Sequence, residues 1–329
     1  MTSLVIVTPW PPQKTGIADN VYDIVAELIK HIPQITIVTN CQNPTLIEGV
    51  DFIYCDEKTS PDLSLYPNIL YEIGNNVTFH KFMIPLIQKY RGVFHIHDLV
   101  LHHIIADLTF IHGTKELYLD TIGKWYGLEV KMLIKKLWLE EKKSPWDTPI
   151  VTDVPLFEEL VQYAESCIVH SDFAKEKILA AFPQLQVEKI FQLYQNLTPS
   201  RTEPVSSSTC KKIGIFGGVD PQKNVDIAIQ AFDLIWQKQK DIELHIVGEL
   251  DQRCKNLIKY AQTLSSNQHI IFHGRVDLKV FHEIASKTDL CIALRYPTMG
   301  ETSAVVMKFL QQGIPVIVND IGWYKELPA

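Results

Sequence analysis

The clearest chemical signal in the sequence is a positive charge beside a helix start. Arg295 follows the apolar run DLCIAL directly, and the segment RYPTMGETS (Arg295–Ser303) then leads into a helix. Free N–H groups at a helix start bind anions, and an arginine there suits a bidentate contact with a phosphate. The segment also offers a turn glycine, an acceptor for hydroxyl groups and two capping side chains: Gly300, Glu301, Thr302 and Ser303. We interpret it as a site for a phosphorylated, hydroxyl-rich molecule; a capped helix with a salt-bridged arginine is the alternative.

A second segment with anion-binding character is the loop FGGVDPQKN, Phe216–Asn224. It follows the apolar run KIGIF, and the pair Gly217-Gly218 allows backbone N–H groups to approach a phosphate. Lys223 lies where the next helix starts, so its charge adds to the positive end of the helix dipole. The pattern favours a diphosphate as ligand, and a glycine turn with a surface lysine is the alternative.

The loop TPWPPQKTGIADN follows the first apolar run of the chain. Its two prolines stiffen the exit from the strand, and we expect Gly16 to turn the backbone where a side chain would clash. Asp19 or Asn20 is expected to cap the next helix. Loops of this kind lie at the carboxyl edge of a parallel sheet, where ligands bind, although an ordinary connector remains the alternative. The Gly-x-Gly-x-x-Gly spacing of dinucleotide-binding loops is absent.

The segment VFHIHDLVLHHI combines histidines with a carboxylate, which raises the question of a metal site: His95, His97, Asp98, His102 and His103. His95 and His97 flank one residue of a strand, whereas the later pair falls on a following helix, so we expect no metal ion. We interpret His97 as a polar group at the carboxyl end of the strand, able to donate to a substrate hydroxyl or a leaving group. A hydrogen-bonded structural histidine is the alternative.

Short runs rich in Val and Ile alternate with amphipathic stretches, which predicts a parallel sheet covered by helices on both faces. Such regular alternation is typical of doubly wound α/β domains. The first series of expected strands is Leu4–Val7, Ile35–Thr39, Phe52–Cys55, Ile69–Ile73, Gly92–His97, Ser166–Val169 and Ile190–Tyr194. The second series is Lys212–Phe216, Glu243–Val247, Ile270–His273, Leu290–Leu294 and Pro315–Val318, and helices are expected over Asp19–His31 and Asn224–Gln239.

A run rich in Pro, Ser and Thr, TPSRTEPVSSST, predicts a linker between two domains. We therefore expect an N-terminal domain over residues 1–198, a linker over 199–209 and a C-terminal domain over 210–329. The first domain holds a helical insertion, Lys115–Glu141. The second has five expected strands, and because a doubly wound domain normally adds a helix after them, we expect it to be truncated.

Bulk composition narrows the class of protein. A net charge of −7 argues against nucleic acid as a partner. The six cysteines show no Cys-x-x-Cys pair and no metal-knuckle spacing, so we expect buried thiols in a reducing compartment. The N-terminus has no signal-peptide pattern, and no run reaches the length of a membrane span, which predicts a cytoplasmic protein. Peripheral contact with a membrane stays open.

Taken together, these segments resemble the retaining glycosyltransferases of family 4, among the bacterial glycosyl transferases group 1, which have the GT-B fold. The resemblance runs along nearly the whole chain and in the family's order. TPWPPQKTGIADN resembles the N-terminal glycine loop, YEIGNN and HDLVLHH resemble segments of one subgroup, and IVHSDFAKEKI resembles the family's "VHS" strand and helix. FGGVDPQKN is similar to the family's phosphate loop, and RYPTMGETS followed by GIPVIVNDIGWYKELP is similar to its donor-binding segment.

The resemblance implies two Rossmann-like domains facing a cleft, the first binding the acceptor and the second a nucleotide-sugar. Lys223 and Arg295 would neutralise the diphosphate, and the donor's phosphate and sugar would lie near Gly217, Gly218, Gly300, Thr302 and Ser303. The backbone at Gly274, Arg275 and Val276 would meet the base. His97 and Glu301 would act at the donor sugar, Gly16 would let the diphosphate or acceptor approach, and Ile17 and Asp19 would line the acceptor side. No metal or other cofactor is implied.

The sequence departs from the family pattern in three places. The arginine of the phosphate loop is replaced by Gly218. The family's two glutamates, with seven residues between them, fall on Gly300 and Lys308, so that Glu301 is one residue late. The C-terminal helix that usually crosses back to the first domain is not in this chain.

These observations predict an enzyme that transfers a hexose from a nucleotide-diphosphate sugar, with retention, to a glycan or a lipid-linked sugar. Two alternatives stay open. The missing arginine and displaced glutamate are compatible with a catalytically impaired binding domain of the same fold. A sugar-nucleotide epimerase has the same two-domain shape, but it would need acid and base groups for which the sequence has no specific pattern.

Overall fold

The computed structural model describes residues 3–56, 58–141, 144–192 and 210–328. The chain forms two compact units. The first holds the residues up to 193 together with 299–302 and 326–329, and the second holds residues 194–298 and 303–325. The expected linker, Thr198–Thr209, lies outside the described residues. Each unit is described below by itself.

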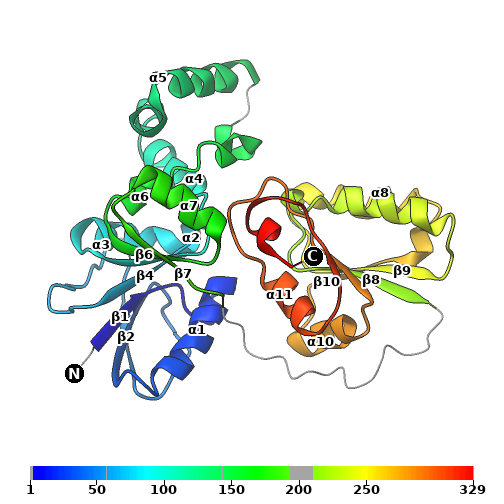
Figure 1. The fold of residues 1–329 in the computed structure, drawn as a ribbon, viewed down its shortest axis with the longest axis horizontal. Helices are drawn as coiled ribbons and strands as arrows, with labels where there is room; N and C mark the ends of the chain where they lie inside the picture. Colours follow the sequence, from blue (N-terminus) through cyan, green and yellow to red (C-terminus); the bar gives the residue numbers. More distant parts are fainter. Residues whose placement is uncertain (1–2, 57, 142–143, 193–209, 329) are drawn as a thin grey trace. The chain divides into compact units, whose positions relative to one another are not determined.

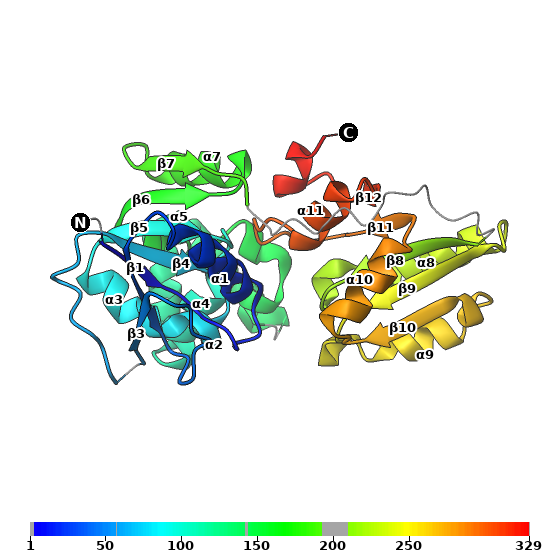
Figure 2. The ribbon, with the colours of Figure 1, turned by 90° about the horizontal axis from the view of Figure 1, so that it is seen from below.

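The N-terminal unit contains a seven-stranded sheet whose strand pairs are all parallel, in the order β3-β2-β1-β4-β5-β6-β7. Central strands of this kind bury side chains on both faces, which explains the near-continuous runs of Val and Ile. The strands are seen side by side in Figure 2. Their bounds are β1 Ser3–Val7, β2 Gln34–Thr39, β3 Val50–Tyr54, β4 Ile69–Ile73, β5 Gly92–Ile96, β6 Ala164–Val169 and β7 Gln186–Lys189.

Two separate apolar cores cover the faces of this sheet. On one face, Val21 and Val25 of α1 pack with Ile6, Ile35 and Ile37. A larger core on the other face includes Tyr71, Ile73, Phe94 and Ile96 together with residues of the remaining helices. The helices of the unit are α1 Gly16–Leu28, α2 Val77–His80, α3 Ile84–Lys89, α4 His102–Ala106, α5 Lys115–Glu141, α6 Glu158–Val161 and α7 Asp172–Ala181.

The expected helical insertion is confirmed as α5, which stands away from the sheet in Figure 1. The helix is interrupted at Gly127, whose φ of 84° and ψ of 172° are not helical. An aromatic cluster ties the insertion to the unit, since the rings of Tyr118 and Trp138 lie 5.7 Å apart and both contact Trp146.

The C-terminal unit repeats this plan with a five-stranded parallel sheet in the order β10-β9-β8-β11-β12. In Figure 1, α8 runs along one face while α10 and α11 lie on the other. Each face has its own apolar core, built around Ile229 and Phe232 on the α8 face and around Phe216 and Phe309 on the other. The bounds are β8 Lys211–Phe216, α8 Val225–Trp236, β9 Ile242–Val247, α9 Asn256–Gln262, β10 Ile270–Gly274, α10 Leu278–Ser286, β11 Leu290–Ile292, α11 Ala304–Gln311 and β12 Val316–Ile317.

Two sequence-based expectations about local structure are wrong. The last strand of the first sheet is β7, Gln186–Lys189, and not Ile190–Tyr194; Tyr194 lies outside the described residues. An edge strand needs few buried side chains, so the polar sequence QVEK carries no apolar signal, and only Val187 is buried there. The first helix begins at Gly16, not at Asp19, because Thr15 occupies the N-cap position.

The expectations about cysteines and membrane spans can also be compared with the structure. All six cysteines are free thiols, and all except Cys210 are buried, as expected for small apolar side chains. In the part of the chain that the structure describes, we find no helix with both the length and the apolar character that crossing a bilayer requires.

Candidate functional site

The strand order of the C-terminal sheet defines where a ligand is expected. The chain leaves β8 in one direction to build β9 and β10, and in the other direction to build β11 and β12. In open α/β sheets, ligands bind beyond the carboxyl ends of the strands at this switch point. The loops after β8 and β11 are therefore the site loops, and they contain Lys223 and Arg295.

Hydrogen bonds join these two loops directly. The amide of Tyr296 donates to the carbonyl of Gln222 at 2.7 Å, and Nδ2 of Asn224 donates to the carbonyl of Tyr296 at 3.2 Å. Asn224 has a left-handed φ of 48° and forms the N-cap of α8. The structure thus brings together two segments, about 70 residues apart in sequence, that were each interpreted as anion-binding.

Lys223 lies over the glycine turn that follows β8. Its Nζ donates to the carbonyl of Phe216 at 3.0 Å. A Cβ atom placed on Gly217 would lie 2.7 Å from this Nζ, and the φ of Gly217 is +87°. A glycine at position 217 therefore lets the ammonium group lie against the backbone at the carboxyl end of β8.

Gly248, a glycine that the sequence interpretation missed, also lies at the carboxyl edge of the C-terminal sheet. A Cβ atom at Gly248, directly after β9, would lie 2.0 Å from the carbonyl oxygen of Gly217. The amide of Gly248 in turn donates to the carbonyl of Gly274 at 2.8 Å. Gly217 and Gly248 thus directly follow β8 and β9, and Gly274 is the last residue of β10, so three neighbouring strands end in partly exposed glycine backbone. A glycine at the end of an apolar strand was the available signal in each case.

Arg295 has a partner within the protein that the sequence interpretation did not name. Its Nη1 lies 3.4 Å from both carboxylate oxygens of Asp220. The amide of Arg295 donates to Oδ1 of Asn319 at 2.6 Å, which fixes the backbone where the chain leaves β11. The salt-bridged arginine, left open as an alternative, is therefore what the structure contains. Contact of Arg295 with a phosphate stays a prediction.

The segment before α11 is organised by its own side chains. Ser303 is the N-cap, and its Oγ accepts a hydrogen bond from the amide of Val306 at 3.4 Å, which confirms its expected capping role. Oε2 of Glu301 accepts from the amide of Met299 at 2.6 Å. Gly300 has a left-handed φ of 72°, so the turn requires glycine. Thr302 is not the cap, because it precedes Ser303.

The remaining predicted residues of the C-terminal unit have few contacts that bear on their predicted roles. A Cβ atom at Gly218 would meet no atom within 4 Å, so a side chain fits at this position. Arg275 forms an exposed ion pair with Glu249 at 3.6 Å. Val276 packs against the core that contains Phe216. These observations leave the assignment of residues 274–276 to the nucleotide base as a prediction.

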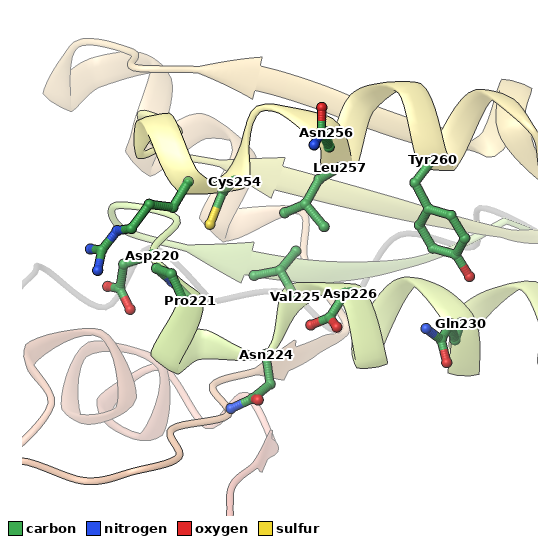
Figure 3. A pocket seen from close by; sticks show the side chains of 11 residues that line it. Asp220, Pro221, Asn224, Val225, Asp226, Gln230, Cys254, Asn256, Leu257 and Tyr260 are labelled. Atoms are coloured by element: carbon green, nitrogen blue, oxygen red, sulfur yellow. The ribbon is translucent and has the colours of Figure 1, made fainter. Parts of the chain in front are cut away.

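A cavity of about 450 Å³ opens beside the loop after β8, between α8 and α9. Figure 3 shows Asp220 at one end and Tyr260 at the other, with Val225 and Leu257 between them. Its other lining residues are Pro221, Asn224, Asp226, Gln230, Arg253, Cys254 and Asn256. None of the predicted donor-binding residues lines it, although it shares Asp220 with the ion pair of Arg295.

In the N-terminal unit, the switch point lies between β1 and β4. We expected a side chain at position 16 to clash with the rest of the protein. This expectation is wrong, because a Cβ atom at Gly16 would meet no protein atom within 4 Å. Ile17 lies against the loop after β4, because a Cβ atom on Gly74 would be 2.6 Å from its Cδ1. Asp19 lies in the first turn of α1 and not at its cap.

The five polar residues of the histidine-rich segment separate into two groups. His102 is a structural residue of α4, with Nδ1 donating to the carbonyl of Val154 at 2.5 Å and Nε2 accepting from the hydroxyl of Tyr118 at 2.6 Å. His103 and Asp98 both interact with Asn75, in the loop after β4. These three residues, Asp98, His102 and His103, form one group, and His95 and His97 form the other.

Glu72 and His170 instead surround His95 and His97. Glu72 pairs with His95 across β4 and β5, and His95 pairs with Ile168 across β5 and β6. His97 and His170 each lie two residues further along, so all four side chains point to one face of the sheet. Sequence reasoning missed Glu72 and His170 because this register is not visible in the sequence. The motifs YEIGNN and IVHS nonetheless contain them.

Burial decides the charge states in this group. Desolvation raises the pKa of Glu72, but the charges and hydrogen bonds of His95 and His97 outweigh it and hold that pKa below its usual range. Burial, together with the nearby His95, lowers the pKa of His97. The pKa of His170 falls to about 3, first through burial and then through His95 and His97. Glu72 is therefore an anion at neutral pH, and His97 and His170 are neutral.

Comparison with known proteins gives the class of the fold. Residues 210–328 match the family model described as glycosyl transferases group 1. WaaG, a glycosyltransferase involved in lipopolysaccharide biosynthesis, is similar over 98% of this chain and 82% of its own, with TM-score 0.60 and 11% identity. HepE from Anabaena, in complex with UDP and glucose, is similar over 100% and 83%, with TM-score 0.63 and 14% identity.

Sucrose-phosphate synthase from Thermosynechococcus elongatus is similar over 98% of this chain and 82% of its own, with TM-score 0.61 and 14% identity. No curated protein sequence matches the chain. At these identities the likeness concerns the fold, which is GT-B, with two Rossmann-like units as expected from the sequence. The family match concerns the C-terminal unit.

Proposed function

We propose that the chain is a retaining glycosyltransferase that takes a hexose from a nucleotide-diphosphate sugar. The family match of residues 210–328 supports transferase activity, and the likeness to HepE, which is known in complex with UDP and with UDP-glucose, favours a uridine diphosphate donor. The acceptor class carried over from the sequence is a glycan or a lipid-linked sugar.

The observation that carries the proposal is the placement of Lys223 over Gly217 at the switch point of the C-terminal sheet. The Nζ atom lies against backbone at the carboxyl end of β8, where a diphosphate would also meet the amides that follow the strand. As the glycosidic bond to the donor breaks, negative charge develops on the leaving diphosphate. A fixed ammonium group and oriented amides stabilise that charge without reorganising.

The segment before α11 would hold the rest of the donor. Ser303 already caps α11, and the first amides of that helix favour an anion in front of it. Glu301 would exchange its bond to the amide of Met299 for a sugar hydroxyl. Arg295 would exchange Asp220 for a phosphate oxygen. With these groups, charge at the diphosphate is met by protein cations and helix ends, and no metal ion is required there.

In the N-terminal unit, His97 keeps its proposed role at the donor sugar. Gly16, Ile17 and Asp19 keep theirs at the acceptor side or the approaching diphosphate. Two of these assignments gain a physical argument. The open space at Gly16 leaves room for a ligand group, and Nδ1 of His97 is buried without a hydrogen-bond partner among the described residues.

The decisive experiment is calorimetric titration of the full chain with UDP, UDP-glucose and other nucleoside diphosphates. We expect binding of at least one of them, and Lys223→Ala is expected to weaken it about 10-fold to 100-fold, as for loss of a charged hydrogen bond. Lys287→Ala is the matched control, because Lys287 forms an exposed ion pair with Glu283 one helical turn away. Absence of binding by every nucleotide would refute the proposal.

Turnover and stereochemistry need a separate measurement. Proton NMR of the product formed from an α-linked donor would show an α-linked sugar if configuration is retained. A β-linked product would refute retention while leaving glycosyl transfer in place.

A second candidate is a donor-binding domain with impaired catalysis. It is favoured by one observation, the engagement of Arg295 by Asp220 together with the absence of a cation at Gly218. This candidate predicts nucleotide binding without release of sugar. Incubation with radiolabelled UDP-glucose and measurement of free glucose separates the two, because slow donor hydrolysis accompanies an active transferase site.

A further inference from the structure

The proposed function uses His97 alone, but in the N-terminal unit this residue belongs to a buried group of three histidines. His95, His97 and His170 each offer one ring nitrogen, and these three atoms lie within 4.8 Å of one another. The exposed fractions of the three side chains are only 4, 7 and 6%. His95 lies in β5, whereas His97 and His170 directly follow β5 and β6, neighbouring parallel strands whose register sets their spacing.

On each of the three rings, one nitrogen is already held by an acceptor. Nδ1 of His95 lies 2.9 Å from Oε2 of Glu72, and Nε2 of His97 lies 2.5 Å from the same oxygen. Nδ1 of His170 lies 3.1 Å from the carbonyl oxygen of Ile190. A carbonyl and an ionised carboxylate only accept, so each of these ring nitrogens carries the proton.

The opposite nitrogens are the ones left to face a further partner, and two of them face each other. Nε2 of His95 lies 3.0 Å from Nε2 of His170. Nδ1 of His97 is buried and has no hydrogen-bond partner among the described residues. Two lone pairs at this distance repel each other, so the arrangement needs a positive centre between them: either an additional proton or a cation.

A second histidine pair in the same chain shows the ordinary solution. In the C-terminal unit, Nδ1 of His245 lies 3.0 Å from Nε2 of His273, while Nε2 of His245 faces Glu243 at 3.1 Å. Here neutral tautomers suffice, because His273 donates to the lone pair on His245. No third imidazole is grouped with this pair in the described part of the chain. The His95 group differs because all of its donors are already committed.

We propose that His95, His97 and His170 bind a divalent transition-metal ion of the zinc type, with Glu72 as the outer carboxylate. Zn–N bonds of about 2.0–2.1 Å place tetrahedral ligands about 3.3 Å apart, close to the His95–His170 separation. Ligating histidines usually donate their other ring N–H to a carboxylate or a carbonyl, which is the pattern that Glu72 and Ile190 provide. The charge of Glu72 also offsets part of the charge of the ion in this buried place.

Three imidazole ligands leave a fourth position for water or for a hydroxyl group. The ion would fix the rings of His97 and His170 at the carboxyl ends of β5 and β6. His97 would then act at a substrate through the ion and not through its own Nδ1. This inference departs from the expectation of no metal, and it does not depend on glycosyl transfer.

The test begins with the full chain, which is stripped by chelator, dialysed and then supplied with Zn²⁺ or Co²⁺. We expect one Zn²⁺ bound per chain by mass spectrometry of the metal content. We also expect one bound Co²⁺ with the strong visible absorption of a tetrahedral site. X-ray absorption at the zinc edge should show three imidazole nitrogens in the first shell. Absence of Zn²⁺ and Co²⁺ binding, or a shell without imidazoles, would overturn the inference and leave an extra proton as the positive centre.

Variants locate the site. His97→Gln and His170→Gln should each weaken Zn²⁺ binding more than 100-fold, and Glu72→Gln about 10-fold to 100-fold, as for an outer partner. His273→Gln is the matched control, because it removes one member of the other histidine pair, in which His245 is buried and His273 is half-buried, and should leave the metal content unchanged. Circular dichroism checks the folding of each variant. If a variant fails to fold, the X-ray absorption of the unaltered chain still decides the question.

Failure of this inference is distinguishable from failure of the proposed function. Metal content and nucleotide binding are separate measurements on the same protein. A chain that binds UDP but no Zn²⁺ contradicts only the metal site, whereas a chain that binds Zn²⁺ but no nucleotide contradicts only the transferase.

Discussion

The two sheets of the molecule share the same kind of strand order but build their carboxyl edges from different groups. In the N-terminal unit, the edge is made of side chains: Glu72, His95, His97 and His170. In the C-terminal unit, it is made of backbone, with Gly217, Gly248 and Gly274 at the ends of three neighbouring strands. One fold therefore supports two kinds of polar surface.

The difference explains how each edge responds to change. A side-chain edge depends on protonation, because each buried ring must hold its hydrogen atoms in one arrangement. A glycine edge contains no titratable group of its own, but it depends on the absence of Cβ atoms, because amides must stay accessible and neighbouring loops approach closely. The predictions below alter one unit at a time.

The largest effect is expected for Gly248→Ala. The new Cβ atom would lie 2.0 Å from the carbonyl oxygen of Gly217, so one of the two loops must move. Backbone strain and overpacking together predict a loss of about 4 kcal/mol in the free energy of unfolding, measured by urea denaturation. Gly218→Ala is the control, because its Cβ would meet nothing within 4 Å. Equal stability of the two variants would contradict the close approach of the loops.

A pH effect is expected in the N-terminal unit, where the His102 ring is buried. Burial lowers the pKa of His102 from 6.5 to about 4. The unfolded chain therefore takes up this proton first, and the stability falls as the pH drops from 6.5 to 4, by about 3 kcal/mol for this residue. His102→Gln should remove that part of the pH slope in denaturation experiments, whereas the exposed His31→Gln should not. An unchanged slope in His102→Gln would contradict a neutral, buried His102.

Gly217→Ala should affect ligand binding more than folding. The added Cβ would meet the flexible end of Lys223 at 2.7 Å and displace the ammonium group, while the left-handed φ costs about 1 kcal/mol. We expect UDP binding to weaken about 10-fold, the equivalent of roughly 1.4 kcal/mol. Calorimetry on the folded variant measures this. Unchanged affinity would mean that the position of Lys223 does not matter for the diphosphate.

The smallest expected effect is a gain. Gly218→Arg restores the cation that the resembling family carries at this position, where the structure has space for a side chain. We expect UDP to bind about 3-fold more tightly, and the gain to decline with added salt because the site is open to solvent. Gly218→Gln has a side chain of similar reach without the charge, and it should show no gain. Weaker binding by Gly218→Arg would place the diphosphate elsewhere.

Much of the fold could be predicted because its signals are local. Runs of Val and Ile mark strands that are buried on both faces, and the regular helical stretches between them indicate the doubly wound plan. The exception, β7, is an edge strand with one buried residue, so it has no such signal. Ser303 could be recognised as a cap for the same reason: the bond to Val306 spans only three residues.

Site geometry was less predictable because it depends on register and on contacts distant in sequence. Arg295 was correctly placed after its strand, but its pairing with Asp220 crosses 75 residues. His95 and His97 were recognised, yet their partners Glu72 and His170 come from the strands on either side. Asp98, His102 and His103 looked equally suitable in the sequence but belong to other hydrogen bonds.

The sequence by itself determined the class of fold, the glycine turns after the strands and the residue types that could meet a diphosphate. These follow from periodicity and from backbone freedom, which are properties of short segments. Only the tertiary structure decided which polar side chains meet. Strand register places Glu72, His95, His97 and His170 on one face of the sheet. Burial then keeps water away from these side chains, so their polar atoms must meet one another.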